Sequence, residues 1–124
     1  MKKQQKFSIR KRLKSFKYAF NGLRILFREE HNSRIHFVAA LCVLIAGYFL
    51  NITATEWCIV IFAIGFVFAM EIINSAIENL ADFVSTERHE SIKRIKDLSA
   101  AGVLVSAIAA LVVGIIVFLP KIID

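Results

Sequence analysis

Apolar residues are concentrated in three long runs along the chain, and polar segments separate these runs. The runs lie near 34–51, 56–81 and 98–119, and each approaches or exceeds the roughly 20 residues that a helix needs to cross a bilayer. The third run carries no charged residue, whereas the wholly apolar part of the first is short. The hydropathy pattern predicts an all-α membrane protein with three transmembrane helices.

The segment 8–29 precedes these runs and has a different pattern. Its large apolar residues recur at intervals of three and four, which places them on one face of a helix. They are Leu13, Phe16, Phe20, Leu23 and Phe27. Lysines and arginines lie beside this face, so we expect an amphipathic surface helix with its cations near anionic lipid. A disordered basic arm, the alternative, describes residues 1–6 better than this segment.

Basic residues are unevenly distributed, and this predicts an orientation. Of the 16 lysines and arginines, eleven precede residue 35 and four lie in the loop 82–97, whereas the loop 51–56 has none. Because basic segments stay in the cytoplasm, we expect the N-terminus and the second loop to be cytoplasmic. The net charge of +6 over 124 residues is then explained without nucleic acid. A chain of this length is expected to form one domain, 1–124.

Two carboxylates, Glu71 and Glu78, interrupt the second apolar run. With Asn74 and Asp82 they follow helical spacing and share one face. Ionisable groups at membrane depth are costly, so they indicate a functional site by default. Their alternative role is structural, as buried and hydrogen-bonded acids. In the predicted orientation they lie in the cytoplasmic half of the membrane, where a soluble substrate can meet a lipid head group.

Small residues recur every fourth position in the third run. They are Gly102, Ser106, Ala110 and Gly114. In lipid, small residues allow helices to approach closely. This seam predicts either a homo-oligomer or close contact between helices of one chain.

Two histidines, His31 and His36, stand near the start of the first run. Five positions apart, they face different sides of a helix. We therefore interpret them as interfacial polar residues and not as a pair of metal ligands.

Carboxylates at this depth can act as general bases or as oxygen ligands of magnesium, which bridges substrate phosphates. Glu30 is expected at the same depth as Glu78, and the second loop adds a charged cluster on the same side. Together these features favour phosphoryl transfer involving a lipid. The alternative is a non-enzymatic membrane protein, either a proton- or cation-conducting oligomer or a packing subunit. A pore should carry polar groups along the full bilayer depth, whereas here they crowd one half of one helix.

Several motifs follow one another in a defined order. They are SFKYAFNGLR at 15–24, Glu30, EIINSAIE at 71–78, Asp82, His89 and Lys96-Asp97. In this order and spacing they resemble the small prokaryotic integral-membrane diacylglycerol kinases, a family that includes undecaprenol kinases. The resemblance extends from about residue 10 to residue 119.

The resemblance implies a kinase that transfers the γ-phosphate of ATP to a lipid hydroxyl, with Glu71 as the general base. It implies Mg²⁺ ligands at Glu30 and Glu78, which would also contact the nucleotide. The other residues that it implies beside ATP are Lys11, Tyr18, Glu87, Arg88, His89, Lys96 and Asp97. Arg10 is the alternative to Lys11. Asn74 and Asp82 would be supporting polar residues.

The resemblance also implies a homotrimer in the bacterial inner membrane, with active sites shared between subunits at the cytoplasmic surface. The acceptor is undecaprenol or diacylglycerol. Enterobacterial diacylglycerol kinases have a second glutamate where this chain has His36, and the form Glu30-x-Asn-x-x-Ile-His36 is more similar to the undecaprenol kinases. This difference favours a polyprenol acceptor and leaves diacylglycerol open.

Overall fold

The computed structural model describes residues 8–87 and 89–123, which form four α-helices. These are α1 (Ile9–Glu29), α2 (His31–Phe49), α3 (Ala54–Val84) and α4 (Glu90–Ile123). By length and composition, α2, α3 and α4 can each cross a membrane. The predicted all-α membrane protein with three apolar helices is confirmed at this level.

The helices are longer than the apolar runs predicted. α2 begins at His31 instead of residue 34. The loop that connects α3 and α4 is shorter than predicted, at residues 85–89 instead of 82–97. The sequence added to α4, Glu90–Asp97, is rich in Glu, Lys and Arg, which favour helix as strongly as most apolar residues do. The end of an apolar run therefore marked where polarity changes and not where the helix ends.

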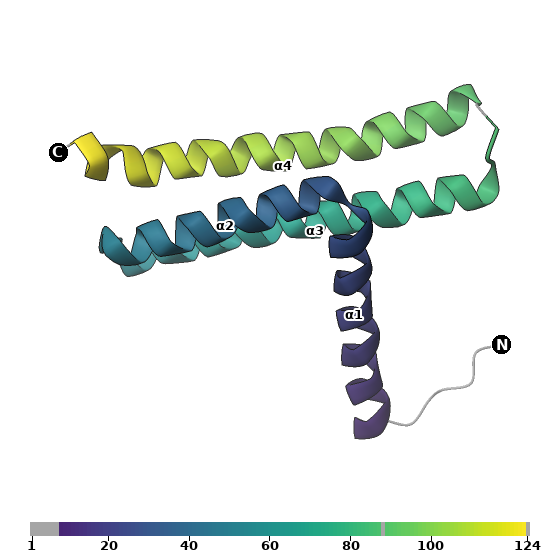
Figure 1. Cartoon of the computed structure of the whole chain (residues 1–124), viewed down its shortest axis with the longest axis horizontal. Coiled ribbons are helices and arrows are strands. Elements are labelled where there is room, and N and C mark those ends of the chain that lie inside the picture. The colour runs from purple at the N-terminus through teal and green to yellow at the C-terminus, as the bar shows by residue number, and fades with distance from the viewer. Residues whose placement is uncertain (1–7, 88, 124) are drawn as a thin grey trace.

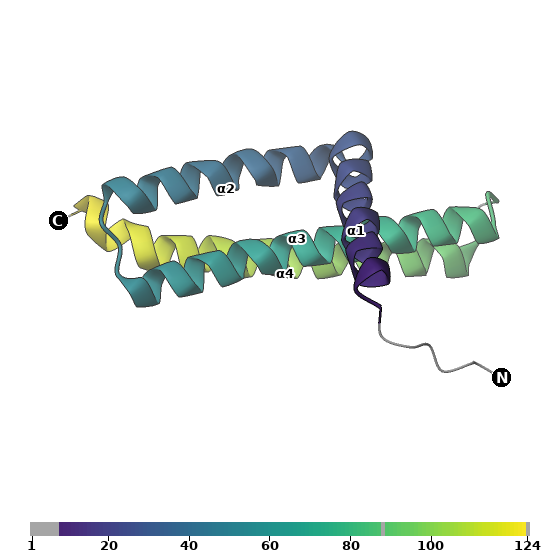
Figure 2. The same ribbon diagram turned by 90° about the horizontal axis from the view of Figure 1, so that it is seen from below.

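The long helices lie along one another, and α1 runs crosswise to them and projects away from the bundle (Figure 1). α3 and α4 are antiparallel and make the most extensive helix contact of the molecule. α2 runs beside the first part of α3 and is set apart from α4 in the turned view (Figure 2). The ends of α3 and α4 nearest their connecting loop extend past the level of α1 (Figure 1).

The junction of α1 and α2 is held by side chains from both helices. Glu30 separates them with an extended backbone, at φ −103° and ψ 108°. Arg34 then reaches back, its Nε donating to the Phe27 carbonyl at 2.7 Å and its Nη2 to the Arg28 carbonyl at 2.6 Å. A cation on the last carbonyls of a helix also complements its dipole. The rings of Phe27 and Phe37 pack edge to face with their centroids 5.3 Å apart, and this contact helps to set the crosswise direction of α1.

The opposite end of the bundle contains a small apolar cluster below the α2–α3 turn. Ile52, Val60 and Val117 are buried there. The turn depends on Asn51, which adopts the left-handed conformation at φ 52°, and on Gly47, where a Cβ would lie 2.9 Å from the Trp57 ring. An added side chain at residue 47 would therefore push α2 away from the start of α3.

The small residues of α4 contact other helices of the same chain at two of their four positions. Ser106 is fully buried, and a Cβ on Gly102 would lie 2.6 Å from Cε of Met70 on α3. Of the two interpretations of this seam, contact within one chain is therefore observed. Most large apolar side chains of α2, α3 and α4 remain exposed, as expected where lipid or neighbouring chains cover them.

Candidate active site

Glu71 lies enclosed between α2 and α3, with 1% of its surface exposed. Ser33 Oγ donates to its Oε2 at 3.5 Å, the long limit of a hydrogen bond. His36 Nε2 lies 3.6 Å from its Oε1, within ion-pair distance but beyond hydrogen-bond distance. Among the described residues, Oε1 is the buried side-chain oxygen that has no hydrogen-bond partner. One oxygen of this carboxylate thus has a donor at the limit of hydrogen-bond distance, and the other has none among the described residues.

Sequence analysis missed both partners of Glu71. Ser33 and His36 stand three positions apart on α2 and so share one face, and the contact between α2 and α3 directs this face toward Glu71. The spacing of Ser33 and His36 was the available signal. The sequence analysis compared His36 with His31 and interpreted both as interfacial polar residues, and it did not consider Ser33 beside His36.

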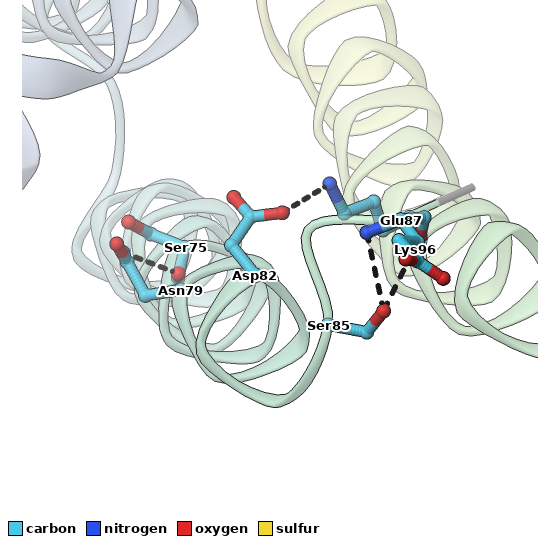
Figure 3. A network of polar contacts seen from close by, with 6 residues as sticks. All are labelled: Ser75, Asn79, Asp82, Ser85, Glu87 and Lys96. Atoms are coloured by element: carbon cyan, nitrogen blue, oxygen red, sulfur yellow. Dashed lines mark hydrogen bonds and ion pairs between the residues drawn. The ribbon is translucent and has the colours of Figure 1, made fainter. Parts of the chain in front are cut away.

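The polar face of α3 divides between two neighbours. Glu71 turns to α2, whereas Asn74 accepts a hydrogen bond on Oδ1 from Ser99 Oγ of α4 at 2.7 Å. About two turns further along α3, Asp82 Oδ1 lies 2.6 Å from Lys96 Nζ of α4 (Figure 3). Asn74 and Asp82 therefore join α3 to α4 near the site, as supporting polar residues would.

Glu30 and Glu78 form a second acidic pair near the α1–α2 junction. The two charges repel each other, Asp82 adds to the repulsion, and Lys96 opposes it. Glu30 makes no side-chain cap bond to α2. In residues 8–87 and 89–123, no group of three or more His, Cys, Asp or Glu side chains has a geometry that would hold a metal. Two carboxylates beside phosphate groups are nevertheless a common magnesium arrangement.

The loop between α3 and α4 is organised by its own side chains. Ser85 Oγ accepts from the Glu87 backbone N–H at 3.2 Å (Figure 3). The Glu87 carboxylate lies 3.5 Å from His89 Nε2, and both side chains are largely exposed. Arg88, also expected at the nucleotide, lies outside the described residues. Asp97 pairs with Lys93 at 2.8 Å and not with its neighbour Lys96.

The residues predicted beside ATP do not converge within one chain. Lys11 and Tyr18 are exposed on α1, and Lys11 belongs to the end of α1 that points away from the bundle. Glu87 and His89 lie at the far tip of α3 and α4. Within this chain, Glu30, Glu78 and Lys96 are close enough to interact, whereas the proposed contacts at the two tips, among them Lys11 and Glu87, lie apart from them.

An apolar groove of about 510 Å³ runs between α2, α3 and α4. Small residues open it, among them Ala40, Ala63 and Ala110. His36 is the ionisable residue among those that line it, and His36 also reaches Glu71. The groove therefore joins a lipid-like environment to the enclosed carboxylate.

Sequence comparisons identify the family. Residues 17–118 match the model of the prokaryotic diacylglycerol kinases, and these residues include Glu30, Glu71 and Glu78. The chain belongs to the prokaryotic diacylglycerol kinase family. Lys11 precedes the part that matches the family model.

Relatives in this family carry two names. The chain is 37% identical over 108 residues to the undecaprenol kinase of Bacillus subtilis, covering 87% of this chain and 88% of that protein. It is 38% identical over 105 residues to the diacylglycerol kinase of Haemophilus influenzae, covering 84% and 86%. It is 33% identical over 100 residues to the diacylglycerol kinase of Escherichia coli, covering 81% and 82%. Identities this similar do not separate the two acceptors.

Proposed function

We propose that this protein transfers the γ-phosphate of MgATP to the primary hydroxyl of a membrane lipid, either undecaprenol or diacylglycerol. The observation that supports the proposal most directly is the enclosed carboxylate of Glu71, whose Oε1 has no hydrogen-bond partner and lies 3.6 Å from His36, a residue that lines the apolar groove. Family membership supplies the class of reaction. Undecaprenyl phosphate or phosphatidic acid would be the product.

Glu71 is the general base in this proposal. Oε1 accepts the proton of the lipid hydroxyl while the hydroxyl oxygen attacks the γ-phosphorus, and Ser33 keeps the other oxygen in place. A membrane environment with little water strengthens this interaction with the hydroxyl. The acceptor chain would extend into apolar surroundings such as the groove beside His36.

Glu30 and Glu78 are the proposed Mg²⁺ ligands. Their mutual repulsion is relieved by a cation between them, and magnesium commonly uses one or two carboxylates together with substrate phosphates. Bound magnesium would neutralise charge on the phosphates of ATP. Asn74 and Asp82 would keep α3 and α4 in register around these ligands through Ser99 and Lys96.

The nucleotide contacts are proposed to come from more than one subunit of a homotrimer. Their separation within one chain and the exposed apolar faces of the helices both agree with such an assembly. The residues assigned to ATP are Lys11, Tyr18, Glu30, Glu78, Glu87, Arg88, His89, Lys96 and Asp97. Cross-linking in mixed micelles, with the mass of the cross-linked species measured, would test the trimer.

We place the α1–α2 junction and the α3–α4 loop at the cytoplasmic face of the bacterial inner membrane. The positive charge of the N-terminal segment and of the α3–α4 loop region supports this orientation. α1 would then lie along the membrane surface, because it runs crosswise to the direction of the three long helices and exposes Leu13, Phe16 and Phe20. Labelling of single cysteines placed in the two loops, from either side of sealed vesicles, would test the orientation.

The decisive experiment is phosphate transfer from radiolabelled MgATP in mixed micelles that contain undecaprenol or diacylglycerol. We expect labelled lipid with the native protein and almost none with Glu71→Gln. The preferred lipid would assign the acceptor. Protein that is folded and oligomeric but phosphorylates neither lipid would contradict the proposal and favour a non-enzymatic membrane protein.

A further inference from the structure

Each turnover of the proposed reaction produces one proton. The acceptor loses its hydroxyl hydrogen when its oxygen bonds to the γ-phosphorus, and the bond from that phosphorus to the bridging oxygen of ATP breaks. The electron pair of the broken bond stays on ADP, so the proton remains on the base. Glu71 must release this proton before it can accept the next one.

Glu71 has little access to solvent through which to release it. The residue is 1% exposed, and its contacts with polar side chains of α2 are those to Ser33 and His36. A serine hydroxyl is too weakly basic to take a proton from a carboxylic acid, whereas imidazole exchanges protons near neutral pH. His36 Nε2 lies 3.6 Å from Oε1, the oxygen without a hydrogen bond.

His36 is also more accessible than Glu71. Its side chain is 24% exposed, against 2% for that of Glu71. It stands five residues after the start of α2, about 7 Å along the axis from the surface end of the helix at 1.5 Å per residue. This depth is comparable to the interfacial layer of a bilayer, which is about 5–7 Å thick on each side.

We propose that His36 is the proton outlet of Glu71: Nε2 takes the proton from Oε1 after each phosphoryl transfer and passes it to water at the membrane interface. The proposal rests on the kinase function proposed above and adds a role that acts through Glu71 rather than on the substrate. The Glu71 carboxylate is regenerated, the imidazole becomes an imidazolium, and water then receives the proton. No other co-reactant is needed.

The other groups near Glu71 do not offer an equivalent route. Glu78, on the same helix as Glu71, interacts with it through its negative charge. This charge favours keeping the proton on Glu71 and does not provide an acceptor in contact with it. From α2, Arg34 is occupied with the carbonyls of α1 and has no proton-accepting atom at neutral pH.

The test compares the first turnover with later turnovers by rapid quenching in micelles that contain undecaprenol or diacylglycerol. Native protein, His36→Ala and His36→Gln are measured, with His31→Ala as the matched control because His31 is an exposed histidine at the start of α2. We expect His36→Ala to form one labelled lipid per active site at a near-native rate. Its later turnovers should be about 100-fold slower, the lower end of the range for a proton-transfer group.

Two further measurements separate proton transfer from positioning. Imidazole in the buffer should accelerate the later turnovers of His36→Ala in proportion to its concentration and leave His31→Ala unchanged. His36→Gln, which keeps a side chain of similar reach and hydrogen-bonding ability without a titratable nitrogen, should be as slow as His36→Ala. Glutamine also preserves more of the local volume, so it carries the test if the alanine variant does not fold.

Each other outcome overturns the proposed outlet. Native turnover in both His36 variants would mean that the proton leaves by another path. A slow first turnover that His36→Gln restores would assign His36 to positioning of Glu71. If the native protein phosphorylates neither lipid, the kinase proposal itself fails, and this result is distinguishable because it does not depend on His36.

Discussion

α3 carries one glutamate in its first turn and another near its middle, and these two have opposite environments. Glu56 lies in the first turn, where its Oε1 accepts from the Thr53 backbone N–H at 2.9 Å and meets Lys121 Nζ of α4 at 3.1 Å. Its side chain is 25% exposed. Glu71 is enclosed, and among residues 8–87 and 89–123 it has no lysine or arginine partner and no hydrogen bond at Oε1.

The difference distinguishes Glu56, a carboxylate that stabilises the fold, from Glu71, the carboxylate that we propose as the base. Glu56 completes the capping box that begins α3 and links α3 to α4, so each of its interactions stabilises the fold. A buried carboxylate with an unsatisfied oxygen costs free energy. The environment of Glu71 therefore fits the proposed base, which would accept the proton of a substrate hydroxyl, better than a residue that stabilises the bundle.

The largest expected effect comes from removing the charge of each glutamate in turn. Glu71→Gln should lower the rate of phosphate transfer by about 10² to 10⁴-fold, the range for loss of a general base. Glu56→Gln makes the same chemical change in the first turn of the same helix and should leave the rate within about twofold, because no proposed contact of Glu56 involves substrate. Initial rates with radiolabelled MgATP in mixed micelles check both.

Two results would contradict this comparison. Equal losses in the two variants would show that the assay reports folding of α3 and not chemistry at Glu71. Full activity of Glu71→Gln would remove it as the base. Circular dichroism and the oligomeric mass of each variant, measured in the same micelles, distinguish an inactive protein from an unfolded one.

A second prediction concerns the acidic pair of the proposed magnesium site. Glu78→Gln removes one of the two charges that repel each other and one proposed ligand. We expect the magnesium concentration for half-maximal rate to rise by about tenfold or more, since tenfold corresponds to about 1.4 kcal/mol of lost binding. Activity should recover in part at high magnesium, unlike that of Glu71→Gln. A rate that falls without any change in magnesium dependence would argue against Glu78 as a ligand.

Sequence patterns were sufficient for the elements of this fold because each pattern has a local cause. The apolar runs predicted three helices, and the spacing of Glu71, Asn74 and Asp82 predicted one polar face of α3. The motif EIINSAIE led to the family that the comparisons establish. The roles assigned to the site residues, the magnesium ion and the trimer stay predictions.

The partners of these residues could not be predicted, because they depend on how helices meet. A helical wheel of α3 places Glu71 and Asn74 together, yet one contacts α2 and the other α4. Nothing in the sequence around Glu56 indicates a partner, but the antiparallel arrangement of α3 and α4 brings Lys121 to it. Such pairs join residues far apart in sequence, so no local period reveals them.

A third prediction tests the contact between α3 and α4 at the site. Ser99→Ala leaves Oδ1 of Asn74 without its donor. Hydrogen bonds between membrane helices contribute about 0.6 kcal/mol on average and up to about 1.7 kcal/mol, and this one is short and partly buried, so we expect a loss within this range. Ser91→Ala, at an exposed position of the same helix, is the control and should change stability little. Thermal unfolding followed by circular dichroism measures both; equal stabilities would show that Asn74 finds another partner.

The smallest expected effect is loss of the ion pair at the other end of the bundle. The side chains of Glu56 and Lys121 are 25% and 27% exposed, and ion pairs in contact with water typically contribute about 0.2–1 kcal/mol. Glu56→Gln, Lys121→Met and the double variant form a cycle in which the coupling energy isolates the pair from the loss of the Thr53 cap. We expect a coupling within that range that weakens with added salt, since screened charges interact less.

A coupling above about 2 kcal/mol that is insensitive to salt would mean that neighbouring subunits or lipid exclude water from this end. Glu56 would then be enclosed like Glu71, and only the saturation of its hydrogen bonds would distinguish the two glutamates.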